Sequence, residues 1–488
     1  PALERRVLNS QKEGSFDSLR FRRQCRREFQ HEVEYRQQQL HALGIFGDWE
    51  SAGKNLDPRH EAKIITSFGK LRELGYLNKD RKSGYWCQKC NITLSEDEIE
   101  IRPSPAYSGY VKFPVSVGLE EFGEDVYFVA WIEELWKLAG SVALGLRANC
   151  RYFITECRGE VLILAEEDLT TRFPLEARKN INILGIGKVD ALVDCMCAHP
   201  FLGVDVSIVS IPELPAEESR SEVGAGLKPA PTPPTGVMHL APGHHPTDCQ
   251  IAQALRLPIP SVVDDAGCLT EEAEKFCGIE VVEAGKFIAF ELEKRGYLIC
   301  AEQENIPQPH CLTCGNSALF RPVQQWIFSL DNNRLRHRVL HAHDYWVNHY
   351  SQEEGQWIQQ ALRELTDSCV SCRRGWGIPI PVFRCEGCDY HLSDTRTLRA
   401  LRDLICRRGS DVWFKLNATE LLPPDTVCPN CDAKEFRKEP MLLDGRFAIL
   451  LNATYNSDAK KNSSKLVNVC FFFQDSFYKW FAQFILTS

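Results

Sequence analysis

The sequence predicts a mixed α/β chain in which a β-rich domain interrupts a host domain. Residues 104–300 contain short runs of β-branched and aromatic residues between turn residues, whereas residues 1–103 and 301–444 mix helical and extended patterns. Cysteine pairs stand just before and just after the β-rich stretch. Because an inserted domain leaves and rejoins its host at neighbouring points, these pairs indicate the two ends of an insertion.

The composition is that of a globular protein outside the secretory route. The chain has 488 residues, of which 44% are hydrophobic and 25% charged, enough for two to four domains. A net charge of -9 argues against a basic nucleic-acid coat, although a local patch could still bind RNA. The first residues lack an apolar core, and Asp475 and Lys479 interrupt the most apolar stretch, 467–486. We therefore predict a cytoplasmic protein with no signal peptide and no membrane span.

Two amphipathic helices are predicted near the N-terminus, over residues 17–43 and 59–75. The apolar positions are Phe21, Cys25, Phe29 and Val33 in the first helix, and Ile64, Phe68 and Leu71 in the second. The arginines between the apolar positions of the first helix are Arg20, Arg22, Arg23, Arg26 and Arg27. We interpret these arginines as a solvated face in preference to an RNA contact.

The β-rich domain is predicted from strand-like runs at 126–131, 151–155 and 161–165. One segment inside it, residues 219–236, is rich in Gly, Pro and Ala and has few apolar anchors. Such a segment cannot bury enough surface to offset the entropy of ordering, so we predict a flexible loop there.

The host pattern returns after residue 301. Residues 325–330 are typical of a strand and residues 354–365 of a helix. Residues 445–488 have no clear periodicity, and we interpret them as a degenerate tail.

The 21 cysteines include five C-x-x-C pairs. They are Cys87 with Cys90, Cys311 with Cys314, Cys369 with Cys372, Cys385 with Cys388, and Cys428 with Cys431. Each pair lets two thiolates reach one metal ion from a tight turn, for which Gly315 and Gly387 are suited, and two pairs complete a tetrahedral structural zinc site. Disulfides are unlikely in the reducing cytosol, so clustered cysteines indicate metal ligands.

Two zinc sites are predicted from these pairs. The first joins Cys87, Cys90, Cys311 and Cys314 across the insertion, and the second joins Cys385, Cys388, Cys428 and Cys431 as a zinc ribbon. The alternative is that some of these cysteines are buried free thiols. We prefer that alternative for Cys369 and Cys372, which have no partner pair, and a redox role lacks the expected βαβ context.

Several longer motifs resemble isoleucyl-tRNA synthetase, a class I aminoacyl-tRNA synthetase. They are GDW at 47–49, HEAKIITSFGKLRELGYL at 60–77, YWCQKCNITLSEDEIE at 85–100, TGVMHLAPGHHPTDC at 235–249, VVDDAG at 262–267, PHCLTCGNSALFRPVQQW at 309–326, CVSCRRGWGIPIPVF at 369–383 and SDVWFKLNATELLPPDTVCPNCDAKEFRKEP at 410–440. The similarity covers most of residues 17–444. The cysteine pairs and APGH favour the isoleucyl type over its valyl and leucyl relatives.

The resemblance implies a split Rossmann-like catalytic domain, interrupted by a β-barrel-like editing domain. The catalytic parts would be residues 1–103 and 301–444, the editing domain 104–300, and the tail 445–488. The implied activity is ATP-dependent aminoacylation of tRNA-Ile with isoleucine, using ATP and Mg²⁺, with editing of mischarged valine.

The family's two activation motifs are missing from this sequence. HIGH is expected before residue 17 and KMSKS after residue 447, and neither occurs. The chain is therefore expected to be an internal fragment that is inactive alone. The alternatives are a non-enzymatic, zinc-stabilised tRNA-binding module and a free-standing editing hydrolase.

The resemblance also implies an editing pocket. Asp248 would bind the substrate's α-ammonium and His239 would lie at the pocket wall. The alternative is that His239 is an ordinary strand histidine and Asp248 a helix N-cap. The family's threonines at one wall are replaced by Ile132, Glu133, Glu134 and Lys137. Since these side chains replace hydroxyls that can bind the terminal adenosine and the water, we predict little deacylation.

Overall fold

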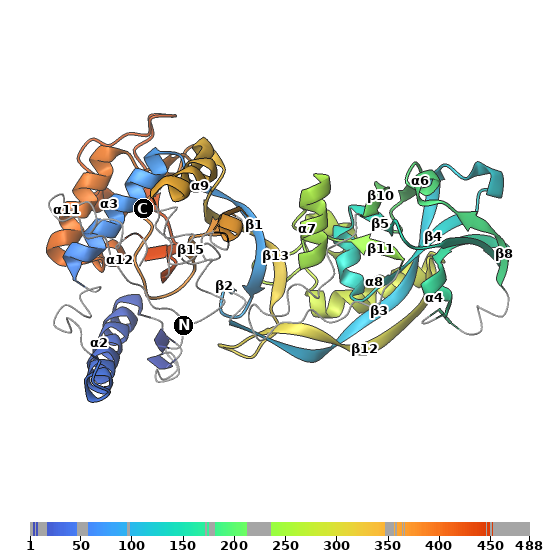
Figure 1. The fold of residues 1–488 in the computed structure, drawn as a ribbon, viewed down its shortest axis with the longest axis horizontal. Helices are drawn as coiled ribbons and strands as arrows, with labels where there is room; N and C mark the ends of the chain where they lie inside the picture. The colour runs from blue at the N-terminus through green and yellow to red at the C-terminus, as the bar shows by residue number, and fades with distance from the viewer. Residues whose placement is uncertain are drawn as a thin grey trace. The chain divides into compact units, whose positions relative to one another are not determined.

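The computed structural model divides into two compact units, whose elements are labelled in Figure 1. Unit 1 comprises Pro1–Asp80 and Gln324–Ser488, and unit 2 comprises Arg81–Val323. The chain leaves unit 1 along β1 (Leu77–Cys87) and returns to it along β13 (Leu319–Phe328). The structure describes residues 3–4, 6–7, 17–45, 57–94, 98–170, 173–174, 181–211, 236–346, 356, 359–363, 365, 367–445, 447–448 and 451.

A closed barrel of six strands forms the centre of unit 2. Hydrogen bonds join the strands in the ring order β3, β9, β10, β5, β11, β4 and back to β3. The bounds are Ile99–Val117 for β3, Val126–Ile132 for β4, Ala143–Arg147 for β5, Met196–Ala198 for β9, Asp205–Ile211 for β10 and Val237–Leu240 for β11. Ring closure pairs the strands without an open edge. The β-barrel-like part of the predicted fold is therefore confirmed.

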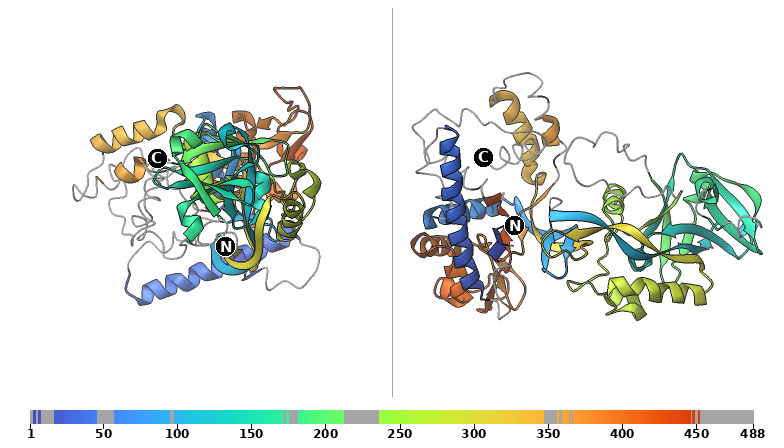
Figure 2. Two further views of the ribbon diagram at one scale, coloured as in Figure 1. Left: turned by 90° about the vertical axis from the view of Figure 1, so that its right-hand side faces the viewer. Right: turned by 90° about the horizontal axis from the view of Figure 1, so that it is seen from below.

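Further strands extend this sheet on both sides of the ring. β7 (Glu160–Ala165), β6 (Tyr152–Cys157) and β8 (Ile181–Gly187) continue from β4, and β12 (Leu298–Cys311) pairs with β3. Figure 2 shows β3 and β12 as a long twisted ribbon. The register of the two strands pairs Cys311 with Ile99. The strand-like runs predicted at 126–131, 151–155 and 161–165 correspond to β4, β6 and β7 and are confirmed.

Helices of unit 2 pack on and beside the barrel. The longest, α8 (Val281–Lys294), is amphipathic and buries Ala284, Ile288 and Leu292 in the barrel core. The others are η3 (Glu120–Phe122), η4 (Leu135–Gly140), α4 (Glu166–Thr170), α6 (Val189–Leu192), α7 (Pro246–Leu255) and η6 (Glu271–Phe276). The short strand β2 (Ile92–Leu94) forms a hairpin with β1.

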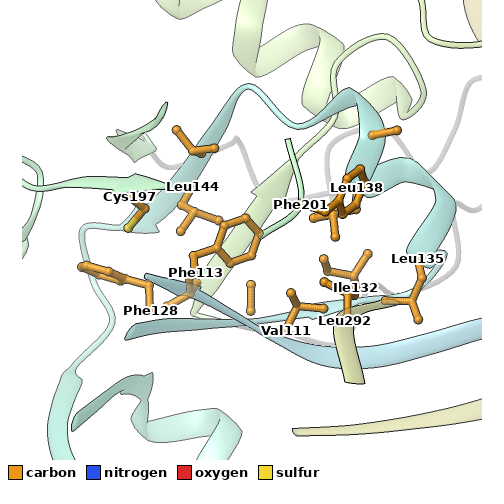
Figure 3. Packing of buried hydrophobic residues seen from close by; sticks show 14 of the residues in the cluster. Val111, Phe113, Phe128, Ile132, Leu135, Leu138, Leu144, Cys197, Phe201 and Leu292 are labelled. Carbon is orange, nitrogen blue, oxygen red and sulfur yellow. The ribbon is translucent and has the colours of Figure 1, made fainter. Parts of the chain in front are cut away.

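The side chains of β4 alternate between two apolar clusters. Phe128 and Ile132 point into the barrel interior, whereas Val129 and Trp131 face the opposite side of the sheet. Ile132 is 3% exposed and lies close to Val111 in the core (Figure 3). The interior is therefore a packed core up to the last residue of β4.

Two helices of unit 1 confirm the predicted pair, but in the first of them only Phe21 and Cys25 of the predicted apolar residues are buried, whereas Phe29 and Val33 are half-buried. α2 (Ser18–Ala42) starts after the N-cap Asp17, whose carboxylate accepts from the Leu19 and Arg20 amides. α3 (Pro58–Glu73) starts with a proline in its first turn after the N-cap Asp57. The predicted apolar residues of α3, Ile64, Phe68 and Leu71, are all buried.

The interpretation of the α2 arginines as a solvated face is wrong for Arg22. Its side chain is buried and donates to Asp411 Oδ1 at 2.8 Å, to the Gly377 carbonyl at 3.0 Å and to Ser410 Oγ at 3.2 Å. The guanidinium also stacks 4.0 Å from the Phe414 ring centre. The i, i+4 spacing from Phe21 to Cys25 did not reveal Arg22 because its partners lie more than 350 residues away.

The remaining elements of unit 1 form small sheets and helices around two apolar clusters. The helices are η7 (Asn332–Arg334), α9 (Leu335–Trp346), α11 (Thr395–Arg408), α12 (Val412–Lys415) and α13 (Ala418–Leu421). The strands are β14 (Ser368–Cys369), β15 (Ser371–Cys372), β16 (Phe383–Cys385), β17 (His391–Leu392), β18 (Phe436–Lys438) and β19 (Leu442–Leu443). β13 contains residues 325–328 of the strand predicted at 325–330.

Some predicted segments fall wholly or partly outside the described residues. Of the helix predicted at 354–365, residues 356 and 359–363 are helical. The loop predicted at 219–236 lies outside except for Gly236. In the tail, Phe447, Ala448 and Leu451 are helical and buried. Within the described part of the chain, no helix is long and apolar enough to span a membrane.

Candidate metal centres and the polar cluster of the barrel

Four cysteines of unit 2 converge at the β1–β2 hairpin and the β12–β13 turn. This first cysteine cluster consists of Cys87, Cys90, Cys311 and Cys314, whose sulfurs all lie within 4.8 Å of one another. The sulfurs of Cys87 and Cys314 are 3.4 Å apart, although the residues are 227 positions apart in the sequence. Tetrahedral Zn–S bonds of about 2.3 Å place sulfurs roughly 3.8 Å apart, so this geometry fits a metal ion.

Four cysteines of unit 1 form the second cysteine cluster in the same way. Its members are Cys385, Cys388, Cys428 and Cys431. The sulfurs of Cys385 and Cys431 are 3.5 Å apart, as are those of Cys388 and Cys428. Strands β16, β17 and β18 form a three-stranded sheet beside the cluster, which fits the predicted ribbon.

The four cysteine pairs of the two clusters share one local backbone conformation. The residue after each second cysteine has a left-handed φ: 53° at Asn91, 74° at Gly315, 62° at Asp389 and 57° at Asp432. Three of these residues donate their N–H to the carbonyl of the first cysteine of the pair, at 2.8–3.1 Å. Asn, Asp and Gly tolerate this conformation best. Gly315 therefore has the predicted turn role, whereas in the second cluster Asp389, and not Gly387, takes the left-handed position.

Backbone amides and polar neighbours favour the thiolate form at two positions. Burial opposes ionisation of Cys311, but the Cys314 and Thr313 amides outweigh it and hold the pKa of this thiol below its usual value. Hydrogen bonds from the Asn430 side chain and the Tyr390 amide lower the pKa of Cys388 to about 6. Thiolates are the form that binds metal.

The fifth pair, Cys369 and Cys372, differs in conformation. The two residues lie on β14 and β15, and their thiols point to the carbonyls of Ser371 and Leu443. Burial raises the pKa of Cys372. The preference for free thiols at these positions therefore fits the structure.

A second group of polar side chains comes from η4 and the residues beside it, from β11 and from α7. We call it the polar cluster: Glu134, Lys137, Ser141, His239 and Asp248. His239 lies on β11 and contacts Ser141 Oγ through Nε2. Burial lowers the pKa of His239 to about 4, so its imidazole is neutral at pH 7.

Asp248 lies buried in the first turn of α7. Its Oδ2 accepts from the Ala241 amide at 2.9 Å, and its Oδ1 lies 3.0 Å from His245 Nδ1. Burial opposes ionisation of Asp248, but His245 and the Ala241 amide outweigh it, so the pKa of this carboxyl lies below its usual value. The helix N-cap is His245, so the alternative of Asp248 as an N-cap is wrong.

Lys137 and Glu134 form an ion pair beside these groups, and their side chains are 17% and 14% exposed. Glu134 Oε1 also accepts from Trp136 Nε1 and from Gln308 Nε2, each at 3.0 Å. Burial opposes protonation of Lys137, but Glu134, Glu133 and Asp248 outweigh it and raise the pKa of its ammonium.

The APGH segment packs tightly against its surroundings. A Cβ on Gly243 would lie 1.9 Å from the Pro260 carbonyl oxygen, so only glycine fits there. His244 Nδ1 lies 3.2 Å from the Phe320 carbonyl, and its Nε2 accepts from the Val262 amide at 3.2 Å. Both ring nitrogens are thus engaged and burial lowers the pKa of His244 to about 3. His244 has a structural role that the motif alone did not reveal.

Comparison with known sequences gives the family. The sequence model of the family described as "tRNA synthetases class I (I, L, M and V)" matches residues 2–488. The chain belongs to this family. The match includes the tail 445–488, for which the sequence pattern predicts no fold.

The relatives of this synthetase chain include several isoleucine–tRNA ligases. It is 32% identical to that of Caldicellulosiruptor saccharolyticus over 480 residues, 97% of this chain and 50% of the relative. It is 34% identical to that of Syntrophomonas wolfei over 430 residues, 88% of this chain and 44% of the relative. The chain thus spans about half the length of the curated relatives it matches.

One solved structure, described as "The crystal structure of GlLeuRS-CP1", is 12% identical and covers 40% of this chain. Its TM-score of 0.29 is too low to support any argument about the fold.

The structure of this synthetase chain separates the residues of the predicted pocket wall. Glu134 and Lys137 belong to the polar cluster, whereas Ile132 is in the apolar core and lines no polar site. Ser141 and Gln308 contact the predicted residues but were not predicted. Gln308 reaches Glu134 from 174 positions away, so no local sequence signal marks it.

Proposed function

We propose that this chain is part of an isoleucine–tRNA ligase in which unit 2 is the editing domain. Unit 1 would be part of the split Rossmann-like catalytic domain, and its residues, 1–80 and 324–488, replace the predicted ranges 1–103 and 301–444. The relatives, which are isoleucine–tRNA ligases, and their 32–34% identity to this chain support the ligase assignment. On this proposal the substrates of the whole enzyme are isoleucine, ATP with Mg²⁺, and tRNA-Ile.

The observation that carries the editing assignment is the position of His239 and Asp248 in the barrel. Both come from the motif at 235–249: His239 lies on β11, and Asp248 on α7 accepts from the amide of Ala241, two residues after His239. Hydrolysis of mischarged valine is needed because one methylene provides only about 1–3 kcal/mol of discrimination, a magnitude established with enzymes of this family. A buried carboxylate beside a neutral imidazole supports binding of the α-ammonium next to the ester.

We further propose that each cysteine cluster holds one zinc ion. The donor set supports this, since four thiolates at tetrahedral distances are typical of structural zinc. A bound zinc ion would supply cross-linking and no chemistry at a substrate. In the first cluster the four thiolates would join the β1–β2 hairpin to the end of the β3–β12 ribbon.

The proposed pocket is expected to hydrolyse its substrate poorly. Both Asp248 oxygens already have partners, and Glu133 and Glu134 can only accept hydrogen bonds when ionised. Reverting Ile132 to threonine would place a hydroxyl in the core, so the useful reversion is the double variant Glu133→Thr/Glu134→Thr.

The test measures release of valine from Val-tRNA(Ile) by the 488-residue chain, beside an intact isoleucine–tRNA ligase. We expect the chain to be at least a hundredfold slower than the intact enzyme, and the double variant to recover part of the rate. A Lys275→Thr variant, changed at a half-exposed site away from the polar cluster, is the matched control. Equal rates of valine release by the chain and the intact enzyme would refute the interpretation that Glu133 and Glu134 impair the pocket. No valine release by any variant, together with retention of tRNA on a gel, would favour the tRNA-binding module.

Aminoacyl activation by the chain alone is expected to be absent. Activation stabilises charge that builds on the ATP phosphates, and the HIGH and KMSKS sequences that do this in the family do not occur within these 488 residues. Isoleucine-dependent ATP–pyrophosphate exchange should therefore equal the blank. Exchange that disappears when isoleucine is omitted would contradict this.

A further inference from the structure

Helix α11 presents a row of arginines on its exposed side. This arginine face, as we call it, consists of Arg396, Arg399, Arg402 and Arg407 around Asp403. With about 3.6 residues per turn, these positions lie on the side of the helix opposite the buried residues Thr397, Leu401 and Ile405. Four cations and one anion give the face a net charge of +3 (4 − 1), whereas the whole chain carries -9. The face is therefore a local basic patch on an acidic chain.

The opposite side of α11 holds this face in a fixed orientation. Leu401 and Ile405 are fully buried in an apolar cluster of unit 1. Helices α3 and α11 lie side by side (Figure 1), and a Cβ on Gly69 of α3 would lie 2.5 Å from Leu398 Cδ1. The Asp394 carboxylate caps the first turn of α11. The arginines thus stand on a helix that is both capped and packed.

Helix stability explains some of these arginines but not all of them. The helix dipole favours a cation in the last turn, where Arg407 stands, and Arg402 donates twice to Asp403 Oδ1, at 2.9 and 2.7 Å. In contrast, Arg396 lies in the first turn, where the dipole disfavours a cation, and it is three residues from Arg399, a spacing at which like charges repel. Among the described residues, Arg399 has no hydrogen-bond or ion-pair partner. An anionic ligand would offset this repulsion.

The side chains of the face are suited to phosphodiester groups. A guanidinium presents a planar fork of N–H donors that matches two phosphate oxygens, whereas a lysine ammonium acts as a point charge, and α11 contains five arginines and no lysine. Arg396 keeps donors for such a ligand beside its bond to the Pro424 carbonyl, at 3.0 Å. The face extends roughly 16 Å along the helix axis, a length over which a nucleic-acid strand presents several phosphates. Contacts with phosphates position a nucleic acid without reading its sequence.

We propose that the arginine face binds the backbone of double-helical RNA without regard to sequence. The choice of RNA rests on the proposed function, because a tRNA ligase meets an RNA with helical arms. The recognition of phosphates rests on the four arginines and not on that function. Neutralising phosphates releases bound counterions, so binding through this face should weaken steeply as the salt concentration rises.

The test measures binding of a fluorescent RNA duplex of mixed sequence to the full chain, between about 50 and 200 mM salt. Arg396→Gln/Arg399→Gln removes two charges and keeps residues of similar helix propensity. We expect this variant to lose at least about fivefold in affinity, and its slope of log affinity against log salt to become shallower by about 2, since each phosphate contact contributes about 1. Arg396→Lys/Arg399→Lys should keep the slope but lose affinity, because an ammonium lacks the guanidinium fork. If the Gln double variant does not fold, Arg399→Gln alone should show half of the change in slope.

The matched control is Arg20→Gln/Arg23→Gln on α2. These two arginines are exposed, have the same three-residue spacing and lie in the N-terminal part of their helix, so the control removes the same charge from another helix face. It should leave the affinity and the slope unchanged. Equal affinities of the α11 and α2 Gln variants would overturn the proposal, because net charge alone would then decide binding. Competition by a polyglutamate peptide as strong as that of the RNA duplex, at equal charge, would indicate an acidic-protein surface and would also overturn it.

A second titration, with tRNA-Ile, separates this inference from the ligase assignment. Binding of tRNA-Ile that weakens in the α11 Gln variant by the same factor as duplex binding supports both proposals. Duplex binding that depends on the α11 arginines, without any binding of tRNA-Ile, supports the arginine face and refutes the ligase assignment. Equal binding of tRNA-Ile and of the duplex by wild type and by the α11 Gln variant refutes the arginine face alone.

Discussion

The cysteine clusters and the polar cluster both unite residues that are distant in the sequence, but they are assembled differently. Each half of a cysteine cluster is a complete turn of about five residues with its own left-handed residue, and a backbone hydrogen bond closes three of the four turns. No part of the polar cluster is complete by itself, because its side chains come from η4, β11 and α7 and are fixed by one another and by the barrel core. Local turns need only to be brought together, whereas the polar cluster needs the whole fold.

The two cysteine clusters also differ from each other in loop length. Cys87 and Cys314 are 227 residues apart, and Cys385 and Cys431 are 46 apart. Closing the longer loop in the unfolded chain costs roughly 1.5 kcal/mol more. Zinc should therefore bind the unfolded chain more weakly through the first cluster, and binding there should stabilise the fold more.

The largest expected effect is loss of the first cluster. Cys311→Ser should reduce the metal content from two zinc ions per chain to one and destabilise unit 2 by more than about 3 kcal/mol, because zinc binding is linked to folding. Elemental analysis and urea unfolding give the two quantities. Cys369→Ser, outside both clusters, is the control and should keep both ions. Less than one zinc ion per folded wild-type chain would refute both metal sites.

Loss of the second cluster should have a smaller effect. Cys428→Ser is the matched change, since Cys428 and Cys311 are both fully buried and both are the first cysteine of the later pair. We expect a destabilisation smaller than that of Cys311→Ser by roughly 1.5 kcal/mol, with one zinc ion retained. A Cys428→Ser variant that is less stable than Cys311→Ser would show that loop length does not decide the difference.

Ile132→Thr tests the statement that the polar cluster depends on the core. It removes a buried methyl group and adds a hydroxyl among apolar side chains, and should destabilise unit 2 by about 1–3 kcal/mol without changing the zinc content. Ile132→Val, which adds no hydroxyl, should cost about 1 kcal/mol. The half-buried Glu133→Thr should cost less than either. If Ile132→Thr left the free energy of unfolding unchanged, Ile132 would have to be assigned to the pocket wall and not to the core.

The smallest expected effect is on the pH dependence of the free energy of unfolding, to which the buried residues His199 and His244 contribute. Their pKa values, about 4 and about 3, lie below the value near 6.5 of an unfolded histidine. The unfolded chain therefore binds more protons than the folded chain as pH falls below 6.5. Their neutral forms stabilise the fold fully above pH 6.5. As the pH falls from 6.5 towards 4, the free energy of unfolding decreases by about 1 kcal/mol per pH unit for each histidine.

Urea unfolding at pH 7.0, 6.0 and 5.5 measures this slope before protons displace metal from the thiolates. His199→Gln should reduce the slope and leave two zinc ions bound. His199 is a suitable site because its ring donates to the Leu138 carbonyl and accepts from the Phe201 and Leu202 amides, contacts that need a neutral ring. An unchanged slope in this variant would assign the pH dependence to other groups.

The sequence by itself determined the features whose causes are local. Helices α2 and α3, the strands β4, β6 and β7, and the four cysteine turns follow from periodicity, capping residues and short spacings, and the pairing of the turns followed from their order along the chain. The alternation along β4 even contained the position of Ile132, since Phe128 and Ile132 are four residues apart and face the same side. The resemblance to the family's threonine-rich segment instead assigned Ile132 to the pocket wall.

Only the tertiary structure decided which polar groups meet. Arg22 is buried because Ser410, Asp411 and Gly377 provide its partners, and nothing within α2 indicates them. Glu134 is fixed by Gln308, and Asp248 binds the Ala241 amide instead of capping α7. Hydrogen bonds and ion pairs are short-ranged and directional, so they depend on where the packed core places each backbone segment. Sequence spacing carries that information for five-residue turns and loses it between strands of a barrel.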